Sequence, residues 1–436
     1  MKRRDTLKPA YQTLPRAVPT DDWRILVLTG LAALTPFILY FSYFSRLFWF
    51  GDEFDMIDQF DRIGFWNWLW IVFAENFVPV FKVFWGGSVL AFHGSYRAML
   101  IIVWLTHALN VVLLGRLLRR CGLSWSAVLV AQALFGLAPT NVETLGWTVQ
   151  WSAIVSVTFL LAALIRFVGS DASKLTVLWS AGSALAFSRG VLTGMVLMVA
   201  SLLGRGEGKK RPLLQRCGWA LAYAAPALAA AFLIAHLAAG NHQHMRGHWL
   251  EAVVFGTFYY TVNPVRLLFL VESWGWHTVV ALGLLKVALV IWALVSSRGR
   301  LRLLFLVLVL LDGGNAVLLG IGRFQTGLGA AQSSRYQYAA LLFWAPMFGY
   351  LLSTLLASAR LPERVRMGLF AAGLAAACFL MCRAWGPTID TFSRERGTDS
   401  RRHLLTDANP ETYSVPGIPF MPIQRARELI VKYHLH

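Results

Sequence analysis

The sequence has few charged residues, and long stretches of it have none. Asp, Glu, Lys and Arg together make up 14% of the 436 residues, whereas a typical soluble domain has about 25%. The apolar stretches run for roughly 17–22 residues, enough to cross a hydrocarbon core of about 30 Å. Most of them have no polar face. This composition excludes a soluble globular protein and predicts an integral membrane protein.

Cysteine is also scarce. The four cysteines are Cys121 and Cys217, at the predicted cytoplasmic ends of helices, and Cys378 and Cys382, within one apolar run. A CxxxC spacing inside a membrane span matches neither a zinc site nor a thioredoxin-type motif. We therefore expect neither disulfides nor a metal–thiolate centre.

Acidic residues are few compared with basic ones. The chain has 22 Asp and Glu against 40 Lys and Arg, a formal net charge of +18. Most basic residues lie in short loops between apolar runs, which is typical of topology signals and of contacts with anionic membrane lipids. No segment combines a basic stripe with exposed aromatic residues, so we expect no nucleic-acid partner.

The distribution of Lys and Arg predicts about eleven transmembrane helices in an all-α fold, with the N-terminus in the cytoplasm. Short loops and the absence of eukaryotic sorting signals favour a bacterial inner membrane. The C-terminal segment should end in a helix near Ile423–His434. The predicted parts are a cytoplasmic segment (1–24), a transmembrane domain (25–383) whose first extracytoplasmic loop (46–95) carries an interfacial helix, and a small extracytoplasmic C-terminal segment (384–436).

Residues 252–272 leave two topologies open. If they cross the membrane, the later loops change sides and the basic loop around Arg300 lies outside. We favour an outer-surface helix or a re-entrant segment interrupted by Asn263-Pro264, because proline breaks a helix.

Acidic residues gather just after the first span, at Asp52, Glu53, Asp55, Asp58 and Asp61. Such a cluster beside a membrane is unfavourable unless solvent, a cation or a basic ligand offsets its charge. A solvated acidic face on the interfacial helix is one explanation for Asp58 and Asp61. The pair Asp52-Glu53 follows Gly51 where the span emerges, and this position favours a chemical role.

Two charged residues stand alone within later spans. Lys286 and Asp312 lie in consecutive antiparallel spans at a similar depth, so we expect them to form an ion pair. A structural pair is favoured over a proton relay. His107, also deep in a span, is expected to be a core residue or a support for the site.

The first half of the chain resembles a known superfamily. The similarity covers roughly residues 25–205. Its motifs are the acidic pair after the first span, a Pro-containing outer segment, a span with His107-Ala-Leu-Asn that ends in Arg-Leu-Leu-Arg-Arg, and a turn with Pro139, Asn141, Glu143 and Trp147. This order resembles the GT-C membrane glycosyltransferases, especially the branch with TMTC-type and protein O-mannosyltransferase-like proteins.

The resemblance implies transfer of a sugar from a polyprenyl- or dolichyl-phosphate carrier to an acceptor on the outer face. It also implies that an acid of the first loop acts as a base or cation ligand, which matches Asp52 with Glu53 beside it. Glu143, His107, Asn141 and Trp147 would then contact substrate or support the site. The chain departs from many relatives in having Ala138-Pro139 for His-Pro and Ser188-Arg189-Gly190 for Lys-Glu, so donor and acceptor stay open.

The chemistry of this transfer independently suggests residue roles. A carboxylate can take the acceptor proton as general base in an oxocarbenium-like transition state. A phosphate leaving group needs positive charge, for which Arg335 beside Tyr336 is our first candidate, then Arg189, then Lys82. Each of these cations could instead be an interfacial anchor. Mg²⁺ or Mn²⁺ could be held by Asp52 and Glu53.

Two other functions are compatible with the sequence. A lipid-linked oligosaccharide polymerase or ligase also uses outer-loop arginines. A lipid or sugar transporter or flippase should have polar residues at the membrane midplane and broken helices in both halves. An inverting transferase requires Asp52 and Arg335 to face one cavity. The oligomeric state is not indicated.

Overall fold

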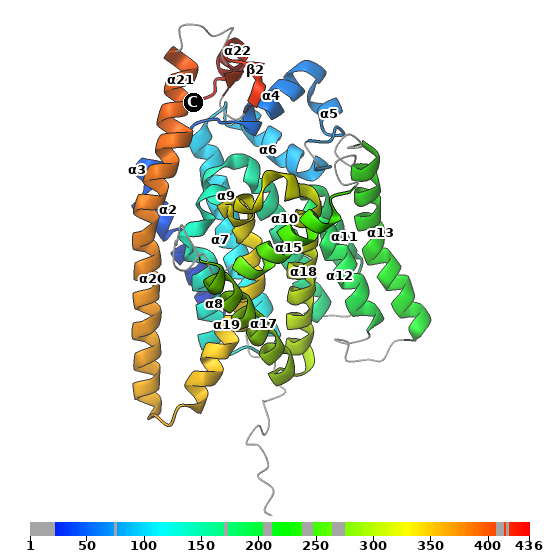
Figure 1. Cartoon of the computed structure of the whole chain (residues 1–436), viewed down its shortest axis with the longest axis vertical. Helices are drawn as coiled ribbons and strands as arrows, with labels where there is room; N and C mark the ends of the chain where they lie inside the picture. The colour runs from blue at the N-terminus through cyan, green and yellow to red at the C-terminus, as the bar shows by residue number, and fades with distance from the viewer. Residues whose placement is uncertain are drawn as a thin grey trace, which may run out of the picture.

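The computed structural model describes residues 22–73, 76–169, 173–203, 212–237, 247–263, 275–406, 414–415 and 418–436. The protein is an all-α membrane protein with one short antiparallel pair of strands, β1–β2 (Figure 1).

Single 3₁₀ turns carry the label η, except for η8, which is a π-helix. In the first half of the chain the helices are α1 (Trp23–Ala32), α2 (Thr35–Leu39), α3 (Phe41–Phe44), α4 (Asp52–Ile63), α5 (Phe65–Trp68), α6 (Pro79–Ala91), α7 (Tyr96–Arg120), α8 (Trp125–Leu137), η1 (Pro139–Asn141), α9 (Val142–Gly146), η2 (Thr148–Gln150), α10 (Trp151–Gly169), α11 (Lys174–Ala186), η3 (Ser188–Gly190) and α12 (Val191–Leu202). The second half contains α13 (Leu213–Leu237), α15 (Trp249–Val262), α17 (Trp276–Ser296), α18 (Gly299–Arg323), η5 (Phe324–Thr326), η6 (Leu328–Gln332), η7 (Ser334–Tyr336), α19 (Gln337–Ser358), α20 (Glu363–Ser393), η8 (Arg394–Asp399), α21 (Ser400–Thr406), β1 (Ser414–Val415), β2 (Ile418–Pro422) and α22 (Ile423–Tyr433).

Seven helices among the described residues are long and apolar enough to cross a membrane, or eight if α8 and the following bent helix η1–α9 form one span. The expected count of about eleven is therefore not confirmed. The shorter apolar helices are Trp23–Leu39, Pro79–Ala91 and Ser188–Leu202.

The first predicted span is broken into α1, α2 and α3. Pro36 stands in the first turn of α2, where its missing N–H group and fixed φ are compatible with a helix start but not with a helix interior. A second break follows at Tyr40, whose backbone leaves the helical region. The chain therefore reaches α4 through short helical segments.

The turn between α8 and α10 is buried. The turn that contains Pro139 and Asn141 is not an exposed loop, because η1, α9 and η2 fold into the protein. Asn141 is fully buried, and its side-chain amide donates to the carbonyl oxygen of Phe135 at 3.0 Å. Backbone groups buried away from water need hydrogen-bond partners, and the side chain of Asn141 supplies one within this turn.

The helices of the first loop lie at one end of the bundle. Figure 1 shows α4 and α5 at the same end as α22, opposite the turn between α19 and α20. The apolar face of α4 is buried at Phe54, Met56 and Phe60. Trp66 and Trp70 are exposed nearby, as expected of aromatic residues at a membrane interface.

The predicted ion pair between α17 and α18 is confirmed. Lys286 Nζ lies 2.7 Å from Asp312 Oδ2, and both side chains are buried. The same ammonium group donates to the carbonyl oxygens of Tyr260 and Asn263 at 2.7 and 2.9 Å. These carbonyls end α15, so the pair joins three helices, with the cation at the negative end of the α15 dipole.

The helix α15 packs mainly against α18, through Phe255 and Tyr259. At 1.5 Å per residue it is roughly 21 Å long, too short to cross a core of about 30 Å unaided. The rest of the ambiguous segment, from residue 264 to 272, lies outside the described residues.

Replacing Asp312 with Asn should leave Lys286 as a lone buried cation, which costs about 3–5 kcal/mol when one partner of a buried pair is removed. We expect folded yield, measured by size-exclusion chromatography in detergent, to fall more than specific activity. A double variant with Lys286→Met and Asp312→Leu should recover part of the yield. Normal yield with lost activity in Asp312→Asn would instead indicate a proton relay.

Candidate functional site

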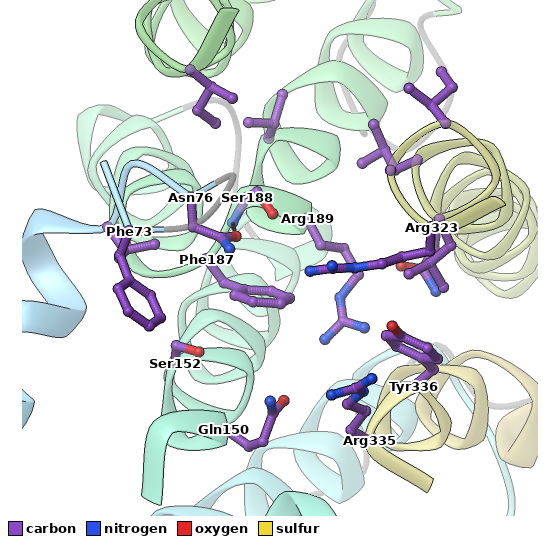
Figure 2. A pocket seen from close by; sticks show the side chains of 18 of the residues that line it. Phe73, Asn76, Gln150, Ser152, Phe187, Ser188, Arg189, Arg323, Arg335 and Tyr336 are labelled. Atoms are coloured by element: carbon purple, nitrogen blue, oxygen red, sulfur yellow. Dashed lines mark hydrogen bonds between the residues drawn. The ribbon is translucent and has the colours of Figure 1, made fainter. Parts of the chain in front are cut away.

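The described part of the chain contains a cavity of about 380 Å³ beside the start of α4 (Figure 2). It is lined by α4, η3, α13, the end of α18 and η7, together with parts of the first loop and α10. Asp52 and Arg335 both belong to its wall, so the structure brings the predicted acid and the predicted phosphate-binding cation to one cavity. The other polar lining residues include Asn76, Gln150, Ser188, Arg189, Arg323 and Tyr336.

Asp52 is the first residue of α4, and the residue before it determines how the helix begins. Gly51 has φ 53° and ψ −125°, a conformation that residues with a Cβ atom rarely adopt. The chain turns sharply at this glycine, and Asp52 reaches the cavity wall.

The carboxylate of Glu53 is buried inside the protein and does not line the cavity. Its Oε2 accepts the backbone N–H of Phe50 at 2.8 Å. Its Oε1 accepts the N–H of Thr148 at 3.0 Å, the hydroxyl of Thr148, and the hydroxyl of Tyr96 at 3.3 Å. Burial raises the pKa of Glu53 to about 7, although these hydrogen bonds favour the ionised form. Glu53 thus anchors the start of α4 to η2 and α7.

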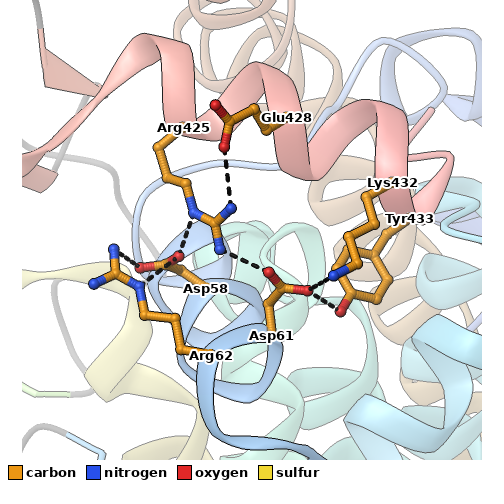
Figure 3. Close-up of polar contacts among 7 residues, drawn as sticks. All are labelled: Asp58, Asp61, Arg62, Arg425, Glu428, Lys432 and Tyr433. Atoms are coloured by element: carbon orange, nitrogen blue, oxygen red, sulfur yellow. Dashed lines mark hydrogen bonds and ion pairs between the residues drawn. The ribbon is translucent and has the colours of Figure 1, made fainter.

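A second anchor of α4 comes from the C-terminal helix α22 (Figure 3). Arg425 donates to Asp58 Oδ1 and to Asp61 Oδ2, both at 2.7 Å. Lys432 Nζ lies 2.6 Å from Asp61 Oδ1, and the hydroxyl of Tyr433 donates to the same oxygen at 2.5 Å. Asp58 and Asp61 are therefore ion-paired, whereas one explanation offered from the sequence was a solvated acidic face.

Burial opposes ionisation of Asp61, but the hydrogen bonds from Lys432, Tyr433 and Arg425 outweigh it and lower its pKa to about 2. The pairing of α22 with α4 therefore persists through mildly acidic pH. Together with Glu53, it fixes the helix that carries Asp52.

Arg189 lies in η3, the tight turn between α11 and α12. A Cβ atom on Gly190 would lie 1.8 Å from the carbonyl oxygen of Ser183, so only glycine permits this close approach. Asn76 of the first loop accepts the N–H of Ser188 at 3.3 Å. The Arg189 guanidinium lies 5.3 Å from the Phe187 ring, and its Nη2 has no hydrogen-bond partner among the described residues.

Arg335 lies in η7, and Glu143 holds that turn. Glu143 Oε2 accepts the hydroxyls of Ser333 and Ser334 at 2.9 and 3.1 Å and the backbone N–H of Arg335 at 3.2 Å. The Arg335 guanidinium packs 5.2 Å from the ring of Tyr336. Its Nε is buried without a hydrogen-bond partner among the described residues.

Arg323, at the end of α18, is a third cation on the cavity wall. The sequence patterns did not assign it a role. Figure 2 shows the guanidinium groups of Arg189, Arg323 and Arg335 directed toward one space. The cavity thus holds three cationic side chains and one acidic side chain, Asp52, and this excess of positive charge favours an anionic ligand. The cavity is thus suited to a phosphate group.

Lys82 and His107 are held elsewhere. Lys82 is fully buried and donates to the carbonyl oxygens of Trp68 and Ile71 at 2.7 and 2.8 Å. His107 lies in the core between the carbonyl oxygen of Gly136, at 3.1 Å, and the hydroxyl of Tyr338, at 3.0 Å. Neither lines the cavity.

Asn141 and Trp147 also lie outside the cavity wall, in the buried turn between α8 and α10. The described residues contain no cluster of three or more His, Cys, Asp or Glu side chains that could hold a metal. The four cysteines are free thiols.

No known family model matches this sequence, and no curated protein matches it. A structural similarity links the chain to the oligosaccharyltransferase of Archaeoglobus fulgidus, whose crystal structure was solved in the apo form. The two chains are 12% identical with a TM-score of 0.44, and the match covers 92% of this chain and 60% of the archaeal protein. A similarity of this degree assigns neither a family nor an activity.

Glu53 should make stability depend on pH. Its pKa is raised from 4.5 to about 7 in the folded protein, so its contribution is fully present below pH 4.5 and is lost as pH rises through about 7. This pKa shift changes the free energy of unfolding by an amount on the order of 3 kcal/mol. Melting temperatures between pH 4.5 and 8 should fall less in Glu53→Gln than in the wild type. Glu363→Gln, at an exposed helix start, should keep the wild-type slope; equal slopes in all three proteins would contradict the assignment.

Asp61→Asn should weaken the contact between α22 and α4 by roughly 1–3 kcal/mol, because Asp61 accepts charged and neutral hydrogen bonds together. We expect faster proteolysis of the C-terminal segment in detergent micelles. Mass spectrometry of the fragments measures the rate. Since Asp61 has a depressed pKa, its contribution is present above its usual pKa of 3.8 and lost as pH falls through about 2. The defect should thus be visible at pH 7. Glu428→Gln is the control, because Glu428 contacts Arg425 from the exposed side; equal proteolysis of Asp61→Asn and the wild type would argue against the contact.

Proposed function

We propose that the protein is a glycosyltransferase of the GT-C type that moves a sugar from a polyprenyl-phosphate carrier to an acceptor hydroxyl at the outer face of the membrane. The observation that supports the proposal is the shared cavity, which is lined by Asp52 together with Arg189, Arg323 and Arg335. The proposal includes a bacterial inner-membrane location, a cytoplasmic N-terminus and an extracytoplasmic C-terminal segment.

The three arginines would bind the carrier phosphate. Arginine presents a planar fork of N–H donors that matches phosphate oxygens. Positive charge at this point stabilises the phosphate as it leaves with the bonding electron pair, so no protein acid is needed to protonate it. Arg189 and Arg335 both line the cavity, which is where the phosphate would bind.

Asp52 would act as general base. In the proposed step its carboxylate takes the proton of the acceptor hydroxyl, and the resulting oxygen nucleophile attacks the anomeric carbon. The bond between that carbon and the phosphate oxygen breaks, and the electron pair leaves on the phosphate. Attack from the face opposite the leaving group inverts the anomeric centre, as a single displacement requires.

The apolar part of the cavity wall supports a lipid-linked donor. It is contributed by α13, through Ala231 and Ile234, and by α18, through Leu318 and Leu319. Isoprene units bury apolar surface favourably against such side chains. Membrane lipids would be the other partners of this surface.

A divalent cation is not required by the steps above. Asp52 supplies one carboxylate to the cavity, whereas Glu53 is occupied by Phe50, Thr148 and Tyr96. Mg²⁺ can be bound through one or two carboxylates together with phosphate oxygens. In the proposal Asp52 is therefore the residue that would hold Mg²⁺ or Mn²⁺.

The test is a transfer assay on purified protein in lipid nanodiscs, with a panel of labelled polyprenyl-phosphate sugars and membrane extracts as acceptors. Asp52→Asn should lower kcat by about 10²–10⁴-fold, the usual contribution of a general base. Arg335→Gln should raise KM for the donor as well as lower kcat. Asp22→Asn, at the start of α1 and distant in sequence from the site, is the control.

Unchanged transfer by Asp52→Asn would rule out this residue as the base. If wild-type protein transfers no sugar from any of these donors, but moves a labelled lipid-linked sugar across vesicle membranes, the protein is a transporter. Formation of long glycan products from lipid-linked oligosaccharides would indicate a polymerase or ligase.

A further inference from the structure

The chain beyond α20 contains a π-helical turn at an unexpected place. The sequence predicts that the last span ends near Arg383, whereas α20 continues to Ser393 and passes into η8 before α21. A π-helix holds one extra residue per turn and commonly marks a functional position. Here a Cβ atom on Gly397 would lie 2.2 Å from the carbonyl oxygen of Arg46. The turn is therefore packed tightly against the segment that leads to α4.

Arg396 extends from this turn into a cage of aromatic rings. Its guanidinium carbon lies 4.6 Å from the ring centre of Trp147, 4.8 Å from that of Phe50 and 5.2 Å from that of Phe392. Its Nη2 lies 3.2 Å from Glu143 Oε1. Cation–π contacts and an ion pair thus hold a largely buried side chain. Arg396 is not part of the cavity wall.

Two of the groups that Arg396 contacts, Phe50 and Glu143, are connected to the cavity. Phe50 stands two residues before Asp52, and its backbone N–H binds the anchoring carboxylate of Glu53. Glu143 uses its other oxygen to hold the turn that carries Arg335. Arg396 therefore lies between the segment of the acid and the segment of the cation.

The charge of Arg396 matters because Glu143 is buried. One oxygen of Glu143 accepts the two serine hydroxyls and the Arg335 N–H, and the other lies against the Arg396 guanidinium. Removing one partner of a buried charge pair leaves the other charge uncompensated. The guanidinium on Oε1 therefore offsets the charge of the carboxylate that holds η7.

We propose that Arg396 is a positioning residue that sets the placement of Asp52 relative to Arg335. The catalytic part of this inference rests on the proposed function, while the structural part does not. A planar guanidinium can pack between rings and bind a carboxylate at once, which lysine cannot reproduce. Small misplacements of reacting groups lower rates by about 10²-fold.

The test uses Arg396→Gln, Arg396→Lys and Glu143→Gln in full-length protein in nanodiscs. Arg394→Gln is the matched control, because Arg394 belongs to the same turn and pairs with Asp390 at the surface. Hydrogen–deuterium exchange is followed in peptides that cover residues 50–53 and 333–336. These segments contain the amides of Phe50 and Arg335, which donate to Glu53 and Glu143.

Arg396→Gln should speed exchange about tenfold in both segments, since Phe50 loses its contact with the guanidinium and residues 333–335 are held by Glu143, which loses its ion pair. Glu143→Gln should speed exchange in 333–336 and leave 50–53 unchanged, because the ring contacts of Arg396 persist. In the transfer assay Arg396→Gln should lower kcat by about 10–100-fold with a smaller change in KM for the donor. Arg396→Lys should recover part of kcat, and Arg394→Gln should behave like the wild type.

Unchanged exchange in both segments of Arg396→Gln would overturn the proposal, whatever the activity. So would faster exchange spread evenly over the protein, which would mean that Arg396 contributes only to general stability. If wild-type protein transfers no sugar, the exchange pattern still decides the structural inference, and the proposed function fails alone.

Discussion

A carboxylate inside a protein of low dielectric is costly unless hydrogen-bond donors or a cation offset its charge, and Glu143 has both, from distant parts of the chain. One oxygen accepts donors from Ser333, Ser334 and Arg335, and the other binds Arg396. The helix α9 that carries Glu143 is itself buried. Glu143 is therefore a principal support of the part of the cavity wall formed by η7.

Several features could be predicted from local sequence patterns. Lys286 and Asp312 stand out because an isolated charge in an apolar run needs a partner, and equal depth indicated which one. Asp52 and Arg335 were selected because they stand where spans meet the interface. Other features depend on contacts that no local pattern records. Arg396 is 253 residues from Glu143 in sequence, and a single arginine in a polar tail resembles any solvated residue. The count of about eleven spans is not confirmed among the described residues, because short, broken apolar segments such as α1–α3 have the same composition as full spans.

The two adjacent acids illustrate a second limit of sequence reasoning. Successive residues of a helix point about 100° apart, so Asp52 and Glu53 at the start of α4 cannot easily face the same space. Asp52 lines the cavity and Glu53 points to Thr148. Lys82 likewise satisfies backbone carbonyls at the end of α5. Glu53 and Lys82 therefore stabilise the framework of the site. Only the structure distinguishes such residues from those that line the cavity.

The contact between α22 and α4 has a consequence for biosynthesis. Asp61 and Tyr433 are 372 residues apart, and contacts of such separation form late because most of the chain must be ordered first. A ribosome has to produce the whole stretch from α4 to α22 before α4 can bind α22. During membrane insertion the early spans would thus lie in the bilayer while α4 still lacks its contact with α22. The order of synthesis alone would delay formation of the cavity until the rest of the bundle has assembled.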